Sequence, residues 1–350
     1  MSILWRAVKG LAIVVGLTIA LLLAPVAWTE IACRPTGSAA PYAAILPPAH
    51  HRPESRTLMT YPEWDIVHAY EDYAQVLATG DPHDYRFLAG ITGYWGSLCA
   101  VSKAAGAHGG IDGGTKQMVY VIGASFTAEW LLKAAYEETV GQLFTLLRGP
   151  APAPLDRLSA AQAQAYATFL QQTPWYRWDF SADARALSQA ATPVLRDRER
   201  ANALGIEYRA KAAYARVIAA AVSEVGNDAL TLRMIVTGIA PDRLAAFDGL
   251  TVIGLRDQGI EIETVRYRAL TALLHDLARA GADFVEIAGN DEIMFTVLSE
   301  SPTLPGAFAS RQRQGAGDYR HLRLTRVTAL AQDLRALDTS AARLEHVHDY

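Results

Sequence analysis

The chain begins with an apolar segment at residues 10–29, GLAIVVGLTIALLLAPVAWT. It carries no charge, follows Arg6 and Lys9, and precedes Glu30. A helix rises about 1.5 Å per residue, so this segment matches the roughly 30 Å hydrocarbon core of a bilayer. The positive flank predicts that residues 1–9 are cytoplasmic and that the rest of the chain lies beyond the membrane. We therefore predict a single-pass transmembrane helix.

Two alternative interpretations are a cleaved signal peptide and a lipoprotein signal. Signal peptidase sites carry small residues at positions −3 and −1. A cut after Ala27 would place Pro25 at position −3. For a lipoprotein signal that ends before Cys33, Glu30 stands where an aliphatic residue is expected. A retained anchor fits the sequence better than either alternative.

After a tether rich in Pro and Ala (residues 30–58), the spacing of apolar residues is helical as far as residue 226. Thr60, Pro62 and Glu63 have the spacing of a helix start with a capping box. This first helix is predicted to end near Thr79, before Gly80, Asp81 and Pro82. Further helices are predicted at residues 83–105, 115–147, 159–171, 182–191 and 193–225.

The second predicted helix contains Gly90, Gly93 and Gly96. Glycine costs about 1 kcal/mol relative to alanine inside a helix. Three glycines at this spacing therefore predict that another helix, or another part of the chain, passes close to this surface. The alternative is a helix that is broken near Gly93.

The last third of the chain changes to strand-like spacing. Segments 230–237 and 259–265 are rich in β-branched residues and predict strands. Residues 266–280 have the pattern of an amphipathic helix. The apolar runs 283–288 and 293–299 are separated by Gly-Asn-Asp-Glu, which predicts a hairpin.

The predicted fold class is therefore α+β. An N-terminal transmembrane helix is followed by a mainly helical section at residues 59–226 and by a small sheet covered by helices at residues 227–350. Within the second section, residues 301–321 are predicted as a loop and 321–337 as a last strand or helix. The tail from Ser340 is predicted to be frayed.

Composition and charge limit the possible partners. The chain is 51% hydrophobic and 19% charged, which is typical of a globular protein. Its 32 basic and 36 acidic residues give a net charge of −4, and no basic block is present. This balance argues against a nucleic-acid partner.

The chain has two cysteines, Cys33 and Cys99. An even number of cysteines in an oxidising compartment is compatible with a disulfide. Such a bridge would hold the globular body close to the membrane, because Cys33 lies only a few residues after the apolar segment. The alternative is two free thiols, with Cys99 buried on its helix.

The first candidate site is the set Asp65, His68 and Asp72, which spacings of three and four residues place on one helix face. Imidazole and carboxylate both suit Zn, Fe or Mn, so the set is a candidate half-site for a divalent metal. His68 is also a candidate catalytic base, because an adjacent carboxylate would orient its ring. No HExxH motif completes a metal site. The simplest alternative is a solvated polar face.

The second candidate is Glu129, which lies four residues before Lys133 on an apolar helix face. A carboxylate buried there must be paired or have its pKa raised. Glu129 is therefore a candidate catalytic residue. The alternative is an ion pair at the edge of the face, with Trp130 providing the packing. A minority interpretation of this helix is one that lies on the membrane surface.

Four other stretches carry weaker signals. The glycine loop at residues 109–116 lacks the Gly-Lys-Ser/Thr order of a phosphate-binding loop. The carboxylates within residues 286–292, Glu286 among them, have the chemistry of a calcium site but lack EF-hand spacing. The aromatic cluster at residues 175–180 suits packing or a membrane interface. His346 and His348 have chelating chemistry but fall in the predicted frayed tail.

The sequence resembles no family that we could name and indicates no particular cofactor. The leading hypothesis is a periplasmic accessory, scaffold or binding protein that is anchored in the inner membrane and works against a membrane or periplasmic partner. The first alternative is a membrane-tethered, metal-dependent enzyme. The second is a sensor that binds a small molecule or a lipid.

Overall fold

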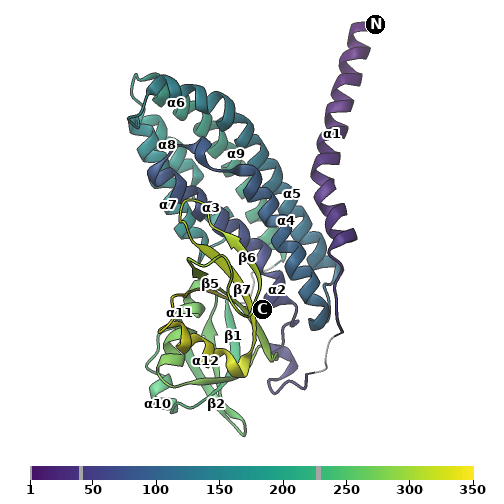
Figure 1. Cartoon of the computed structure of the whole chain (residues 1–350), viewed down its shortest axis with the longest axis vertical. Coiled ribbons are helices and arrows are strands. Elements are labelled where there is room, and N and C mark those ends of the chain that lie inside the picture. Colours follow the sequence, from purple (N-terminus) through teal and green to yellow (C-terminus); the bar gives the residue numbers. More distant parts are fainter. Residues whose placement is uncertain (1, 39–41, 226–229) are drawn as a thin grey trace.

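The computed structural model describes residues 2–38, 42–225 and 230–350 and combines helices with antiparallel sheets (Figure 1). The N-terminal helix α1 (Ser2–Ala32) stands beside the body and contacts α4 and α5 near its C-terminal end. Its apolar part, Val8–Ala32, is long enough to cross a membrane, and the 18-residue window that gives this result contains no buried residue. The predicted apolar N-terminal helix is confirmed.

The first part of the body is helical, and a π-helical turn at Glu137–Gly141 joins α5 to α6. The predicted helices are present, although their ends differ by up to five residues. Thr60 does not cap α3, because α2 runs directly into α3 and Thr60 itself has a helical backbone. The predicted end of the helical section, at residues 226–228, lies outside the described residues. The helices are α2 (Arg56–Met59), α3 (Tyr61–Thr79), α4 (Phe87–Ala104), α5 (Gly113–Tyr136), α6 (Gln142–Arg148), α7 (Pro154–Leu170), α8 (Phe180–Ala190) and α9 (Leu195–Val225).

Trp130 of α5 lies at the centre of the helical core and is fully buried. Aromatic rings from α3 and α4 surround it, among them Tyr70, Tyr73 and Phe87. The predicted packing role of Trp130 is confirmed. The predicted aromatic cluster at residues 175–180 also packs within the bundle, since its rings contact aromatic residues of α7 and α9.

The glycines of α4 permit close approach at two of the three positions. A Cβ atom at Gly90 would lie 2.9 Å from the Tyr85 hydroxyl. At Gly93 it would lie 2.3 Å from the guanidinium carbon of Arg311, which comes from the C-terminal section. Gly96 has no neighbour within 4 Å. Close approach is therefore confirmed at Gly90 and Gly93.

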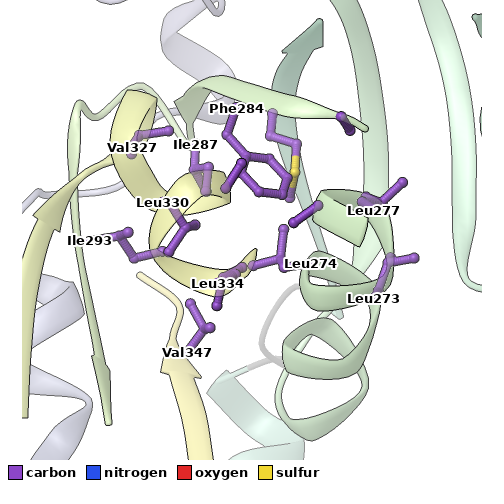
Figure 2. Close-up of a cluster of buried hydrophobic side chains, with 14 of the residues drawn as sticks. Leu273, Leu274, Leu277, Phe284, Ile287, Ile293, Val327, Leu330, Leu334 and Val347 are labelled. Carbon is purple, nitrogen blue, oxygen red and sulfur yellow. The ribbon is translucent and has the colours of Figure 1, made fainter. Parts of the chain in front are cut away.

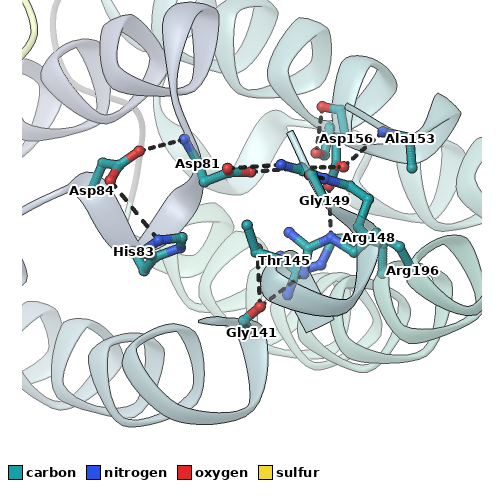
Figure 3. Close-up of polar contacts among 12 residues, drawn as sticks. Asp81, His83, Asp84, Gly141, Thr145, Arg148, Gly149, Ala153, Asp156 and Arg196 are labelled. Carbon is teal, nitrogen blue, oxygen red and sulfur yellow. Dashed lines mark hydrogen bonds and ion pairs between the residues drawn. The ribbon is translucent and has the colours of Figure 1, made fainter. Parts of the chain in front are cut away.

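Ion pairs hold the end of the bundle that carries α6 (Figure 3). Arg148 at the end of α6 donates to Asp81 at 2.7 and 2.9 Å and to Asp156 of α7 at 2.7 Å. Arg196 of α9 donates to the other oxygen of Asp156 at 2.9 Å and to the Gly141 carbonyl at 3.1 Å. These contacts fix four segments that are distant in sequence.

The C-terminal section contains two four-stranded antiparallel sheets, where we predicted one small sheet. Their strand orders are β2-β3-β1-β4 and β6-β7-β5-β8. The strands are β1 (Thr231–Thr237), β2 (Leu250–Arg256), β3 (Gly259–Val265), β4 (Asp283–Ile287), β5 (Glu292–Ser299), β6 (Ala307–Gln312), β7 (Tyr319–Arg326) and β8 (Arg343–His348), and the helices are α10 (Pro241–Leu244), α11 (Arg268–Arg279) and α12 (Val327–Leu337).

The two sheets share one topology. In each, the first strand pairs with the third and the fourth, the second and third form a hairpin, and one helix connects the third to the fourth. Helices α11 and α12 contact each other, and the core around them is shared by both sheets (Figure 2). The other face of the second sheet covers the helical bundle through Met294 and Leu322.

The predicted hairpin at residues 283–299 is wrong. β4 belongs to the first sheet and β5 to the second, and the turn between them is closed by a single bridge from Ile287 to Asn290. Turn residues between two apolar runs have the same local pattern whether the strands pair with each other or diverge. The sequence pattern could not distinguish the two arrangements.

The predicted loop at residues 301–321 and the predicted frayed tail are also wrong. The loop region contains β6 and the first residues of β7, and the tail forms β8. The last residue, Tyr350, is fully buried, and its backbone carbonyl accepts from Arg52 at 3.0 Å. The tail is ordered because β8 pairs, as an edge strand, with β5, which is an inner strand of the second sheet.

Part of the predicted tether packs on the body. The Glu286 carboxylate accepts from the Tyr42 hydroxyl at 2.9 Å and from the backbone amides of Ile45 and Leu46 at 2.6 and 2.8 Å. Leu46 is buried. These contacts attach the segment to β4, and they occupy Glu286, one of the carboxylates considered for calcium.

Candidate functional site

The polar face of α3 lies against the second sheet. Asp65, His68 and Asp72 are each at most 2% exposed, so the prediction of a solvated polar face is wrong. The two aspartates are occupied by the sheet. Asp65 accepts from Arg311 at 2.7 and 2.8 Å. Asp72 accepts from the Gln314 backbone amide at 2.9 Å. The structure therefore does not bring the three predicted ligands together as one half-site.

His68 instead meets two glutamates. Its Nδ1 atom lies 2.9 Å from Glu71 Oε2, one turn along α3. Its Nε2 atom is buried without a hydrogen-bond partner and lies 3.8 Å from Glu345 Oε2 of β8. One ligand atom from each of the three residues falls within 4.8 Å of the others. His68, Glu71 and Glu345 are therefore the residues that could hold a metal here.

Arg320 of β7 is the fully buried cation beside this cluster. It donates to both oxygens of Glu345, at 2.6 and 2.7 Å, and lies 3.8 Å from Glu71. Burial by itself raises the pKa of Glu345, but Arg320 outweighs burial and holds that pKa well below its usual range. Glu345 is therefore ionised at neutral pH.

Two more histidines, His346 and His348 of β8, enter the same region and are at most 1% exposed. Rings of Trp64 and Tyr61 pack against them. His346 Nδ1 bonds the Thr271 hydroxyl at 3.0 Å, whereas its Nε2 and both nitrogens of His348 have no hydrogen-bond partner. Burial lowers the pKa of both imidazoles well below the ordinary value. Both rings are therefore neutral at pH 7.

Sequence reasoning missed Glu71, Glu345 and Arg320. Glu71 has a signal, because it follows His68 by three residues and so faces the same side of α3. Residues 343–348 do not alternate with a strand period, because the apolar residues Leu344 and Val347 are three positions apart, so the local pattern did not predict β8. Nothing local indicates that β8 and α3 meet, since Glu71 and Glu345 are more than 270 residues apart.

Glu129 lies in a different cluster. It pairs with Lys211 of α9 at 2.7 Å and accepts from the Tyr70 hydroxyl. Lys133, its expected neighbour, pairs with Glu207 at 3.0 Å. The side chain of Glu129 is 34% exposed. The local spacing therefore identified the charged residues but not their partners.

We expect the free energy of unfolding to depend on pH through this cluster. Burial by itself raises the pKa of Glu207, but Lys133 and Lys211 outweigh burial and lower it to about 2. Stability from this group is therefore present above pH 4.5 and lost as the pH falls toward 2. The shift corresponds to at most about 3 kcal/mol. Urea unfolding between pH 6 and pH 3 should show a smaller loss in Glu207→Gln than in the wild type.

Glu138→Gln is the matched control, because Glu138 lies exposed on the π-helical turn. It should keep the wild-type acid dependence. Equal pH profiles for the wild type and Glu207→Gln would contradict the assignment.

A second histidine and carboxylate cluster lies where α4 ends. His108 Nδ1 is 3.3 Å from Glu292 and 3.8 Å from Glu54. The nearby Glu54 and Glu292 carboxylates raise the pKa of His108 although burial opposes them, so these groups compensate one another as ion pairs. The glycine loop that follows ends at Asp112, which caps α5 by accepting from the Thr115 amide at 2.9 Å.

The end of α1 is attached to the body by covalent and polar contacts. Cys33 and Cys99 form the predicted disulfide. Glu30 accepts from Lys116 at 3.0 Å and from the Tyr120 hydroxyl at 2.6 Å, both on α5. Disulfides are typical of proteins outside the cytoplasm. A single apolar helix of this length suits an anchor or a signal sequence.

The outer surface of α5 and α6 is apolar. Leu132 and Leu146 are 74% and 73% exposed. Within residues 117–147, all of which the structure describes, Glu138 is the one exposed charged residue. We call this the α5–α6 surface; its large exposed apolar residues are Met118, Val121, Leu132, Val140, Leu143, Leu146 and Leu147.

We compared the chain with protein families, curated proteins and solved structures. No family model matches the chain, and no curated protein or solved structure matches it either.

Proposed function

We propose that the protein is an accessory or scaffold protein of the inner membrane. In this proposal α1 is a retained single-pass anchor, residues 1–9 are cytoplasmic and the body is periplasmic. The uncharged segment after Arg6 and Lys9 supports this orientation. The Cys33–Cys99 disulfide supports an oxidising compartment.

The observation that carries the proposal is the apolar α5–α6 surface beside the anchor. Soluble monomers rarely expose large contiguous apolar patches, and such patches often mark a membrane or partner surface. Glu30 contacts Lys116 and Tyr120, so α5 starts beside the end of the membrane segment. We propose that the α5–α6 surface contacts the lipid of the membrane that holds α1.

The test is a fluorophore at Leu143, which is 53% exposed on α6. Full-length Leu143→Cys, labelled with an environment-sensitive dye in lipid nanodiscs, should show blue-shifted emission. Lipid-borne spin labels should quench it. The native cysteines form the disulfide and do not compete for the dye.

Asp276→Cys on α11 is the matched control, because its side chain is exposed on the C-terminal section. Its emission should resemble that of the dye in water. If the dye at residue 143 behaves like the dye at residue 276, lipid contact is wrong. Crosslinking from residue 143 to a second protein would show that the surface binds protein instead.

The rival function, a metal-dependent enzyme, has one observation in its favour: the buried, unpartnered nitrogen of His68. Its predicted ligands Asp65 and Asp72 are engaged by the second sheet, and His68 is enclosed. A closed metal site is typical of a structural rather than a catalytic ion. We therefore treat metal binding separately from catalysis.

A further inference from the structure

The contact between α3 and the second sheet encloses an unusual group of charges. Glu71 and Glu345 are acidic, and Arg320 is the cation that contacts both. With the His68 imidazole neutral, these groups leave one uncompensated negative charge. The Glu71 and Glu345 side chains are only 17% and 10% exposed, so solvent offsets little of this charge and the site favours a bound cation.

The distance from His68 to Glu345 distinguishes a cation site from a direct hydrogen bond. His68 Nε2 and Glu345 Oε2 are 3.8 Å apart, which is too far for a hydrogen bond. Zinc lies about 2.0–2.1 Å from an imidazole nitrogen and about 2.0–2.2 Å from a carboxylate oxygen. An ion between the two atoms would therefore reach both with a bent ligand–metal–ligand angle.

Glu71 holds the other side of the His68 ring. Its contact with Nδ1, at 2.9 Å, favours the tautomer whose Nε2 is free to bind a metal. Histidines that bind metals almost always donate their second nitrogen to a carboxylate, a carbonyl or water. The arrangement is therefore already present on α3, without any movement of the ring.

We propose that the protein binds one divalent transition-metal ion, of the zinc class, between α3 and β8, with His68 Nε2 and the Glu345 carboxylate as ligands. Glu71 is the second carboxylate of the site and orients the His68 ring through Nδ1. This site goes beyond the proposed membrane role and does not depend on it. Imidazole and carboxylate donors suit zinc.

The adjacent residues of β8 supply further nitrogen donors. His346 Nε2 is buried and unpartnered, as are both nitrogens of His348. The Trp64 ring contacts both His68 and His346, with centroids 5.8 and 3.5 Å away. They lie on the same strand as Glu345, but the group of ligand atoms within 4.8 Å of one another contains only His68, Glu71 and Glu345. A bound ion would connect α3 to the edge strand of the second sheet.

The experiment uses the full-length chain in detergent, stripped with a chelator and titrated with zinc against a chromophoric competitor. We expect about one zinc ion per chain and a higher thermal unfolding midpoint with zinc. Cobalt(II) should give the visible absorption of a low-coordinate site, and zinc should displace it.

Three variants separate the roles of the residues. His68→Gln should remove tight binding, whereas Glu71→Gln should weaken it about 10- to 100-fold, the usual effect of losing the group that orients a ligand. His108→Gln is the matched control in the other histidine and carboxylate cluster. It should leave zinc affinity unchanged.

The wild type alone can overturn the proposal, even if a variant fails to fold. Absence of stoichiometric zinc, or no shift of the unfolding midpoint with zinc, would show that the space holds a proton or water only. A loss of zinc in His108→Gln equal to that in His68→Gln would place the ion in the other cluster. Lipid plays no part in these measurements, so the proposed membrane contact can fail independently.

Discussion

Replacing Arg320 by methionine should lower the free energy of unfolding of the metal-free protein by about 3–5 kcal/mol. Arg320 is 1% exposed and is the guanidinium bonded to both oxygens of Glu345. Methionine fills much of the same volume but leaves Glu345 and Glu71 buried without this cation. Urea unfolding of the full-length chain, followed by tryptophan fluorescence, measures the effect.

Arg343→Met is the matched control for this prediction. Arg343 contacts Asp318 at 3.4 Å, but its side chain is 65% exposed. An exposed ion pair contributes at most about 1 kcal/mol. Equal losses in Arg320→Met and Arg343→Met would show that the buried charges between α3 and the second sheet are compensated in another way.

Replacing Cys99 by serine should cost about 4 kcal/mol of stability under oxidising conditions. The bridge to Cys33 spans 66 residues, and closing a loop of that length restricts the unfolded chain by about this amount in the loop-entropy model. The midpoint of urea unfolding should fall in Cys99→Ser. It should fall equally in the wild type after reduction, which serves as the control.

Gel electrophoresis without reductant provides a second readout. The oxidised wild type should migrate faster than Cys99→Ser, and reductant should remove the difference. Equal mobility in both conditions would show that the bridge does not form. It would also remove the main structural support for a periplasmic body.

The surface between α3 and the second sheet is rich in charged residues. Four arginines of the sheet region, at positions 311, 313, 320 and 323, include three that contact carboxylates of α3. The bundle and the sheet therefore meet through charges rather than through a purely apolar core. The proposed zinc site lies within this interface, where His68 Nε2 has no hydrogen-bond partner and faces Glu345.

The sequence by itself determined the features that depend on neighbouring residues. The apolar segment, the helices and the strand at residues 259–265 follow from local spacing, because burial of one helix or strand face imposes a period. The disulfide followed from cysteine number and compartment alone, since only Cys33 and Cys99 are present.

Only the tertiary structure decided what covers each face. The spacing of Asp65, His68 and Asp72 shows that they share a face, but solvent and an arginine-bearing sheet impose the same spacing. Glu129 likewise has a local partner, Lys133, yet it pairs with Lys211 of α9. The position of β8 against α3 depends on the pairing of strands that are far apart in sequence. The local spacing of apolar residues carries no information about that pairing.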